Sequence, residues 1–236
     1  MHKKLLQLLR DNSQRQVSAL KIENEGEAAT IYLYDVIDPY FGISAEDFNR
    51  QIAGLKGKSI ALRINSPGGD VFDGRAMATA IQQHGDVTVY IDGLAASAAT
   101  YVALAAKQVN IAEGGFFMIH NAWTFAYGNK HDMTSAADLL DKVDQSIIND
   151  YAKKTGKSVD EIVAWMDAET WFTAEEALEH GFVDAVVEVG TQPANTWNLS
   201  AYEKAPEALT KPQLPANTLA DYRETAERRL RLLQIA

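Results

Sequence analysis

Ser97 is the first residue whose surroundings suggest chemistry, because it lies in the small-residue run Leu94-Ala95-Ala96-Ser97-Ala98-Ala99. Small neighbours leave a serine hydroxyl open to a substrate. If a helix begins just after it, the unpaired amides and the positive dipole end favour developing negative charge. The pattern is compatible with a serine nucleophile. It is also compatible with a structural serine that caps a helix or fills a tight contact among alanines.

A serine hydroxyl attacks near pH 7 only with a neighbouring base, so the five histidines are the next candidates. His120 directly follows the apolar run 116–119, a position at which a strand presents a polar side chain to a cleft. The other four occupy a chain terminus, the end of a helix, a polar turn or the position before a stop glycine: His2, His84, His131 and His180. His120 is therefore the candidate base, with a structural histidine as the alternative.

An imidazole base is usually oriented by an acid. Asp167 and Glu169 lie just before Trp171 and Phe172, whose apolar side chains can keep a carboxylate dry enough to hold an imidazolium. Both acids remain candidates.

A glycine-rich turn, Asn65-Ser66-Pro67-Gly68-Gly69-Asp70, follows an apolar strand candidate. Paired glycines allow backbone conformations closed to other residues and bring amides close to a ligand. Such a turn can bind an oxyanion, although its spacing matches neither a P-loop nor a dinucleotide fingerprint. A purely structural turn is the alternative.

The elements that must position these residues alternate between strands and helices, which indicates an α/β fold. Strands are expected at 29–37, 59–64, 87–91, 108–111 and 116–119. Helix starts are predicted where a Ser or Thr precedes an acid by three residues: Ser44 with Asp47, Ser158 with Glu161, and Thr173 with Glu176. A longer helix is expected over 133–154, with an apolar stripe at spacings of three and four.

Composition excludes several function classes. The 236 residues are 47% hydrophobic and 23% charged, which suits a globular protein with one sizeable core. A formal charge of −10 has the wrong sign for nucleic-acid binding, and zero cysteines exclude disulfides and cysteine-ligated metals. The apolar stretch 94–106 is shorter than the roughly 20 residues of a membrane span. With no signal-peptide pattern, we expect a cytoplasmic protein without a membrane partner.

The chain divides near residue 190. Four of the six prolines follow that point: Pro193, Pro206, Pro212 and Pro215. We therefore expect an N-terminal extension over 1–28, a compact domain over 29–189 and a proline-containing linker with a helical tail over 190–236. Residues 219–235 regain a helical pattern, either as a docking helix or as a solvated one.

Four segments together resemble the proteolytic subunit of the Clp protease family. In their order they are the turn 65–69, the run 95–98, the strand end 118–120 and the stretch 172–184. The resemblance spans residues 30–189 and is greatest to the Clp-like head maturation (prohead) proteases of tailed phages. It implies a Clp/crotonase-type fold of repeated β-β-α units, with the helix 133–154 projecting as a handle between subunits.

The resemblance also implies residue roles. Ser97 matches the nucleophile, His120 the general base, and the backbone amides of Gly68 and Ala98 the oxyanion donors. The family's usual aspartate aligns with Glu169, and Asp167 is the alternative acid.

Two features concern the substrate. The segment 123–130 resembles the family strand that pairs with extended substrate. Residues expected to bind substrate are therefore Gly69, Trp123, Thr124, Phe125 and Ala126. Ala122 stands where many members have proline, so the course of this loop is in question.

The implied function is a serine endopeptidase that forms a ring-type homo-oligomer, needs no cofactor or metal, and processes phage scaffold and capsid proteins. One alternative is a cellular Clp peptidase subunit that works with an ATPase unfoldase. A second is a crotonase-like acyl-binding protein without proteolytic activity.

Overall fold

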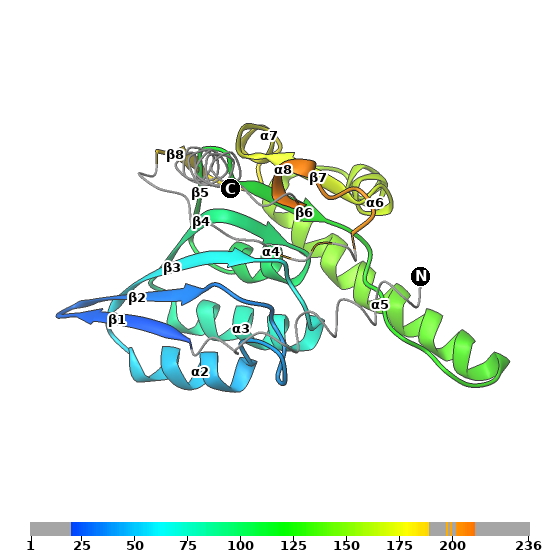
Figure 1. The fold of residues 1–236 in the computed structure, drawn as a ribbon, viewed down its shortest axis with the longest axis horizontal. Helices are drawn as coiled ribbons and strands as arrows, with labels where there is room; N and C mark the ends of the chain where they lie inside the picture. Colours follow the sequence, from blue (N-terminus) through cyan, green and yellow to red (C-terminus); the bar gives the residue numbers. More distant parts are fainter. Residues whose placement is uncertain (1–19, 189–196, 198, 200–201, 211–236) are drawn as a thin grey trace, which may run out of the picture.

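A mixed eight-stranded sheet forms the centre of the computed structural model, which describes residues 20–188, 197, 199 and 202–210 (Figure 1). The main path of the sheet is β1-β2-β3-β4-β5-β8, while β6 pairs with β4 and β7. The strands are β1 (Lys21–Glu25), β2 (Ala28–Leu33), β3 (Ser59–Ser66), β4 (Val87–Ala96), β5 (Gln108–Ala112), β6 (Phe116–Ile119), β7 (Thr170–Thr173) and β8 (Ala185–Val187).

Strands β2, β3, β4, β5 and β8 run parallel, whereas β1 is antiparallel to β2 and β7 is antiparallel to β6. The helices are α2 (Ala45–Gly54), α3 (Val71–His84), α4 (Ala98–Leu104), α5 (Lys130–Thr155), α6 (Val159–Asp167), α7 (Ala174–Glu179) and α8 (Glu207–Thr210). The connections β3-α3-β4-α4-β5 bring the carboxyl ends of neighbouring parallel strands to one edge of the sheet. No helix in the described part of the chain is both long and apolar enough to cross a membrane.

The predicted α/β class is confirmed, and each of the five expected strands is present. Two boundaries are clearly wrong, because the strand expected over 87–91 continues to Ala96 and the strand expected over 29–37 ends at Leu33. Beyond it the chain bends: the Asp35 carboxylate accepts the Val36 amide at 2.8 Å, and Ile37 makes only single bridges, to Ile43 and Gly69.

The predicted helix starts are confirmed by their caps. Ser44 Oγ accepts the Asp47 amide, and complete capping boxes join Ser158 with Glu161 and Thr173 with Glu176. Each cap satisfies an amide that has no partner inside the helix.

The handle helix α5 begins at Lys130 rather than at the expected residue 133, because Asn129 and Asp132 form a further capping box. Its C-terminal half packs on the domain through Ile147, Ile148 and Tyr151, which are buried. Its N-terminal half extends beyond the sheet (Figure 1).

The packed structure extends past both predicted domain boundaries. Strand β1 precedes residue 29, and Ile22 packs against the main core. At the other end, Trp197 and Leu199 are buried against β4 and β6. The tail helix expected over 219–235 lies outside the described residues.

Candidate active site

Ser97 lies at the junction between β4 and α4. Its backbone has φ 53° and ψ −125°, a conformation that residues other than glycine rarely adopt. Its amide donates to the carbonyl of Met118 on β6 at 2.9 Å. A sharp strand-to-helix turn of this kind exposes a serine hydroxyl above the sheet, and strain of this size persists only where the surroundings fix it.

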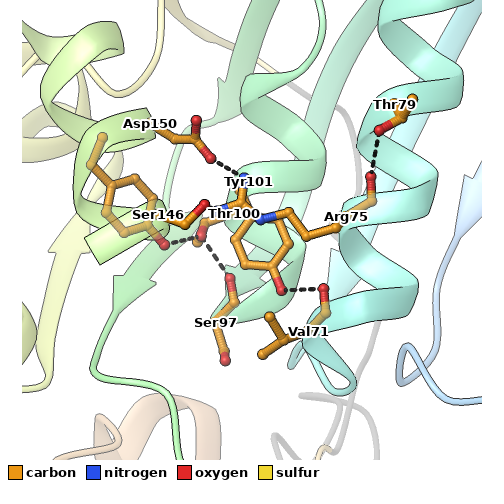
Figure 2. Close-up of polar contacts among 9 residues, drawn as sticks. Val71, Arg75, Thr79, Ser97, Thr100, Tyr101, Ser146 and Asp150 are labelled. Carbon is orange, nitrogen blue, oxygen red and sulfur yellow. Dashed lines mark hydrogen bonds and ion pairs between the residues drawn. The ribbon is translucent and has the colours of Figure 1, made fainter. Parts of the chain in front are cut away.

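Those surroundings include a polar network between α4 and the handle helix. Thr100 Oγ1 donates to the Ser97 carbonyl at 2.6 Å, and Figure 2 shows this contact as a dashed line between the two residues. Thr100 also bonds the hydroxyl of Tyr151, and both residues are buried. Arg75 on α3 also contacts the handle helix α5, through an ion pair with Asp150.

The predicted nucleophile and base are brought together: His120 Nε2 lies 2.8 Å from Ser97 Oγ, within hydrogen-bond distance. His120 follows β6 directly, and β6 pairs with the end of β4 that carries Ser97. Burial lowers the pKa of His120 to about 4, with the charge of Glu169 acting in the opposite direction. The imidazole is therefore neutral near pH 7 and able to accept the serine proton.

The two candidate acids have different partners. The Asp167 carboxylate accepts the side-chain amide of Asn121 at 2.7 Å. The charge of Glu169 acts on His120, but its carboxylate accepts hydrogen bonds from Trp171 Nε1, at 3.2 Å, and from the amides of Glu203 and Lys204. The hydrogen bonds of the described residues include none from His120 to either acid. Of the two acids, Glu169 is the one whose charge raises the pKa of His120.

The glycine turn lies against Ser97. Gly68 has φ +88°, and a Cβ added there would meet Ala98 N at 2.9 Å and Ser97 Cβ at 2.8 Å. The amides of Gly68 and Ala98 are thus neighbours, and Ala98 opens α4, where an amide has no partner inside the helix. The Gly68 amide donates to Ser66 Oγ at 3.2 Å, a long bond that a substrate oxyanion would replace.

A cleft of about 330 Å³ opens beside the Ser97 and His120 side chains. Of the residues expected to bind substrate, those that line it are Gly69, Trp123, Thr124 and Phe125. Ala126 is not among the lining residues. The segment expected to be a strand is not one, because residues 121–127 have no regular secondary structure.

The Ala122 amide explains the departure from proline at this position. It donates to Asp144 Oδ1 on α5 at 2.6 Å, a bond that proline cannot make. The loop after His120 is therefore tied to the handle through a backbone amide.

One contact of the site carried no signal in the sequence. Tyr202, in the proline-containing tail, packs edge-on against the His120 ring, with ring centres 5.4 Å apart. Neither the spacing nor the composition of the tail pointed to this contact.

The fold and these contacts are those expected of a serine hydrolase: a serine hydroxyl lies within hydrogen-bond distance of a neutral imidazole, and a glycine turn lies against the same serine. No cluster of metal-ligating side chains is present in the described part of the chain.

Comparison with known proteins identifies the family. The Clp protease family model matches residues 26–190. The ATP-dependent Clp protease proteolytic subunit 2 of Rhodococcus jostii is 35% identical over 157 residues, covering 65% of this chain and 76% of the relative. A proteolytic subunit from Bacteroides fragilis is 32% identical over 164 residues, covering 66% and 78%. A solved structure of a ClpP1 mutant from Listeria monocytogenes aligns with a TM-score of 0.61 at 25% identity, covering 78% of this chain and 96% of that one.

The chain belongs to the Clp protease family. It is a serine endopeptidase with the Clp protease fold.

Proposed function

We propose that this chain is the proteolytic subunit of an ATP-dependent Clp protease and cleaves extended polypeptides delivered by an ATPase unfoldase. The hydrogen bond between His120 and Ser97, at the mouth of an open cleft, is the observation that supports peptide hydrolysis. The names of the relatives support the ATP-driven partner. Such a partner also agrees with the cytoplasmic location expected from the sequence.

In the proposed reaction, Ser97 Oγ attacks the peptide carbonyl while His120 Nε2 takes its proton. The amides of Gly68 and Ala98 bind the tetrahedral oxyanion, and His120 then protonates the leaving amine. Water, activated by the same imidazole, releases the acyl group from Ser97. Glu169 stabilises the transient imidazolium through its charge.

Substrate is proposed to lie in the cleft as an added strand along residues 122–126. The exposed aromatic side chains of Trp123 and Phe125 would contact alternate substrate residues. A ring-type homo-oligomer, with handles between subunits, would restrict access to unfolded chains.

The test is degradation of an unfolded model protein with and without a hexameric Clp unfoldase and ATP, using Ser97→Ala as control. The proposal expects cleavage that ATP and the unfoldase accelerate and that Ser97→Ala abolishes. Cleavage of folded substrate without stimulation by the unfoldase would contradict it.

Phage head maturation, which the sequence resemblance favours, is the second candidate. The relatives reported above are named instead for the ATP-dependent subunit, so this role stays a prediction. Incubation with phage capsid and scaffold proteins, followed by mass spectrometry, separates the two: head maturation requires Ser97-dependent cuts without ATP. The acyl-binding alternative is disfavoured, since simple binding does not require the contact between Ser97 and His120.

A further inference from the structure

The C-terminal segment formed by residues 197, 199 and 202–210 lies beside the active site and belongs to the packed structure. Trp197 and Leu199 are only 7% and 2% exposed. They cover three apolar residues of β4 and β6 that are themselves at most 1% exposed: Leu94, Ala96 and Met118. Removal of the segment would expose this apolar surface to water, so its docking is favoured by burial.

Tyr202 of this segment contacts three parts of the active site. Its ring meets the His120 ring edge-on, at 82° and 5.4 Å between centres. Its hydroxyl donates to the carbonyl of Pro67, next to Gly68. The hydroxyl of Ser97 also interacts with the phenol. One side chain therefore joins the base, the nucleophile and the glycine turn.

The residues that follow Tyr202 hold the acid. The amide of Glu203 donates to Glu169 Oε2 at 3.0 Å, and the amide of Lys204 donates to Oε1 at 2.8 Å. The Lys204 ammonium also bonds the Ala168 carbonyl. Glu169 itself has φ +48°, a conformation uncommon for residues other than glycine, and its carboxylate is held by the two amides.

We propose that Tyr202 is a positioning residue of the active site, which holds the Pro67-Gly68 turn and the His120 ring in register with Ser97. The inference rests on the proposed peptidase function. It assigns the proline-containing tail a part in building the site, in addition to any role as a linker.

The proposal has a consequence for pH dependence. The groups that face the His120 ring are Ser97 from the start of α4, Glu169 ahead of β7, and Tyr202. Burial lowers the pKa of His120 to about 4, and the Tyr202 ring is part of that covering. Without the ring, water reaches the imidazole and its pKa should rise towards the ordinary value of 6.5.

The test compares Tyr202→Phe, Tyr202→Ala and a matched control, Tyr32→Phe, in the full-length protein. Tyr32 also donates its hydroxyl to a partner, Glu23, but lies on β2 outside the site. Hydrolysis of a fluorogenic peptide is measured as kcat and KM across pH, and assembly is followed by sedimentation.

We expect Tyr202→Phe to lower kcat by on the order of tenfold with little change in KM, since the bond to Pro67 is lost while the ring remains. Tyr202→Ala is expected to lower kcat further and to shift the acidic limb of the profile upwards, from about 4 towards 6.5. A purely structural role would lower the amount of assembled enzyme without moving that limb.

Wild-type kcat in Tyr202→Phe, or an unmoved limb in assembled Tyr202→Ala, would overturn the proposal. If Tyr202→Ala fails to assemble, the kcat of Tyr202→Phe decides alone. Failure of the peptidase function would show differently, as hydrolysis that survives Ser97→Ala.

Discussion

Thr100 Oγ1 donates a hydrogen bond to the carbonyl of Ser97 at 2.6 Å and also bonds the buried hydroxyl of Tyr151. The first turn of α4 is thereby tied to the handle helix, next to the candidate nucleophile (Figure 2). Ser97 itself has a backbone conformation that is rare for residues other than glycine, with φ 53°, and such strain persists only where the surrounding structure holds it.

Thr100→Val should therefore slow the enzyme and destabilise it. The substitution keeps the side-chain shape, removes the bond to Ser97 and leaves the Tyr151 hydroxyl buried without its partner. We expect the free energy of unfolding to fall by about 1–3 kcal/mol. We also expect slower labelling of Ser97 by a fluorophosphonate.

Tyr151→Phe is the matched variant, because it leaves the bond between Thr100 and Ser97 intact. Its labelling should be faster than that of Thr100→Val. Equal labelling of both variants at the wild-type rate would contradict the positioning role of Thr100.

Gly68→Ala should abolish most activity. A Cβ at this position would meet the Ala96 carbonyl at 2.5 Å and Ala98 N at 2.9 Å, so the turn must move away from Ser97. Loss of a single oxyanion donor lowers turnover by on the order of 100-fold to 1000-fold, and we expect an effect of this size in kcat.

Gly57→Ala is the control for backbone strain. Gly57 has φ +84°, close to the +88° of Gly68, but has nothing within 4 Å of an added Cβ. The Gly57→Ala enzyme should be somewhat less stable than the wild type but have the same kcat. A similar loss of kcat in both variants would show that strain, rather than the position of the turn, explains the effect.

The pH profile of kcat/KM should have its acidic limb at an unusually low pH. His120 accepts a proton only when neutral, and burial lowers its pKa to about 4, so kcat/KM should fall as the pH drops through that value. A limb near the ordinary 6.5 would contradict a buried imidazole in the working enzyme.

The lowered pKa of His120 should also make the free energy of unfolding depend on pH. The unfolded chain takes up this proton near 6.5 and the folded chain near 4, so the contribution of His120 is complete above 6.5 and is lost as the pH falls towards 4. Urea unfolding of the wild type and of His120→Gln across this range measures the difference. The pH dependence assigned to His120 should be missing from the variant.

Ala122→Pro should weaken substrate binding more than chemistry. The amide that bonds Asp144 would be lost, and the adjacent Trp123 segment would be released from the handle helix. We expect a several-fold higher KM for a peptide with little change in fluorophosphonate labelling. Asp144→Leu removes the same bond from the other side and should match it. An unchanged KM in both variants would show that the bond between the Ala122 amide and Asp144 does not hold the loop in its substrate-binding position.

Local signals in the sequence predicted much of the fold. Ser158 and Thr173 define helix starts through side-chain caps that depend on a few neighbouring residues, and both caps are present. The short strands β1, β7 and β8 were not predicted. In β1, four of the five residues are exposed, so there is no apolar alternation to reveal the strand.

The site was predicted in part. Ser97 and His120 could be selected because their small or apolar neighbours mark the ends of strands, and they lie in contact. Tyr202 could not be selected, because its position against His120 depends on packing between segments far apart in sequence. Glu169 could be named as a candidate acid, but its bonds to the amides of Glu203 and Lys204 could not be predicted, because those residues lie in the tail.

The most direct test of the account is to treat the assembled protein with a fluorophosphonate and locate the adduct by mass spectrometry. If Ser97 is the nucleophile and His120 its base, a single adduct forms on Ser97, is strongly reduced in His120→Ala and is absent in Ser97→Ala, with peptide hydrolysis lost in parallel. An adduct on another residue, or hydrolysis that persists in Ser97→Ala, would contradict it.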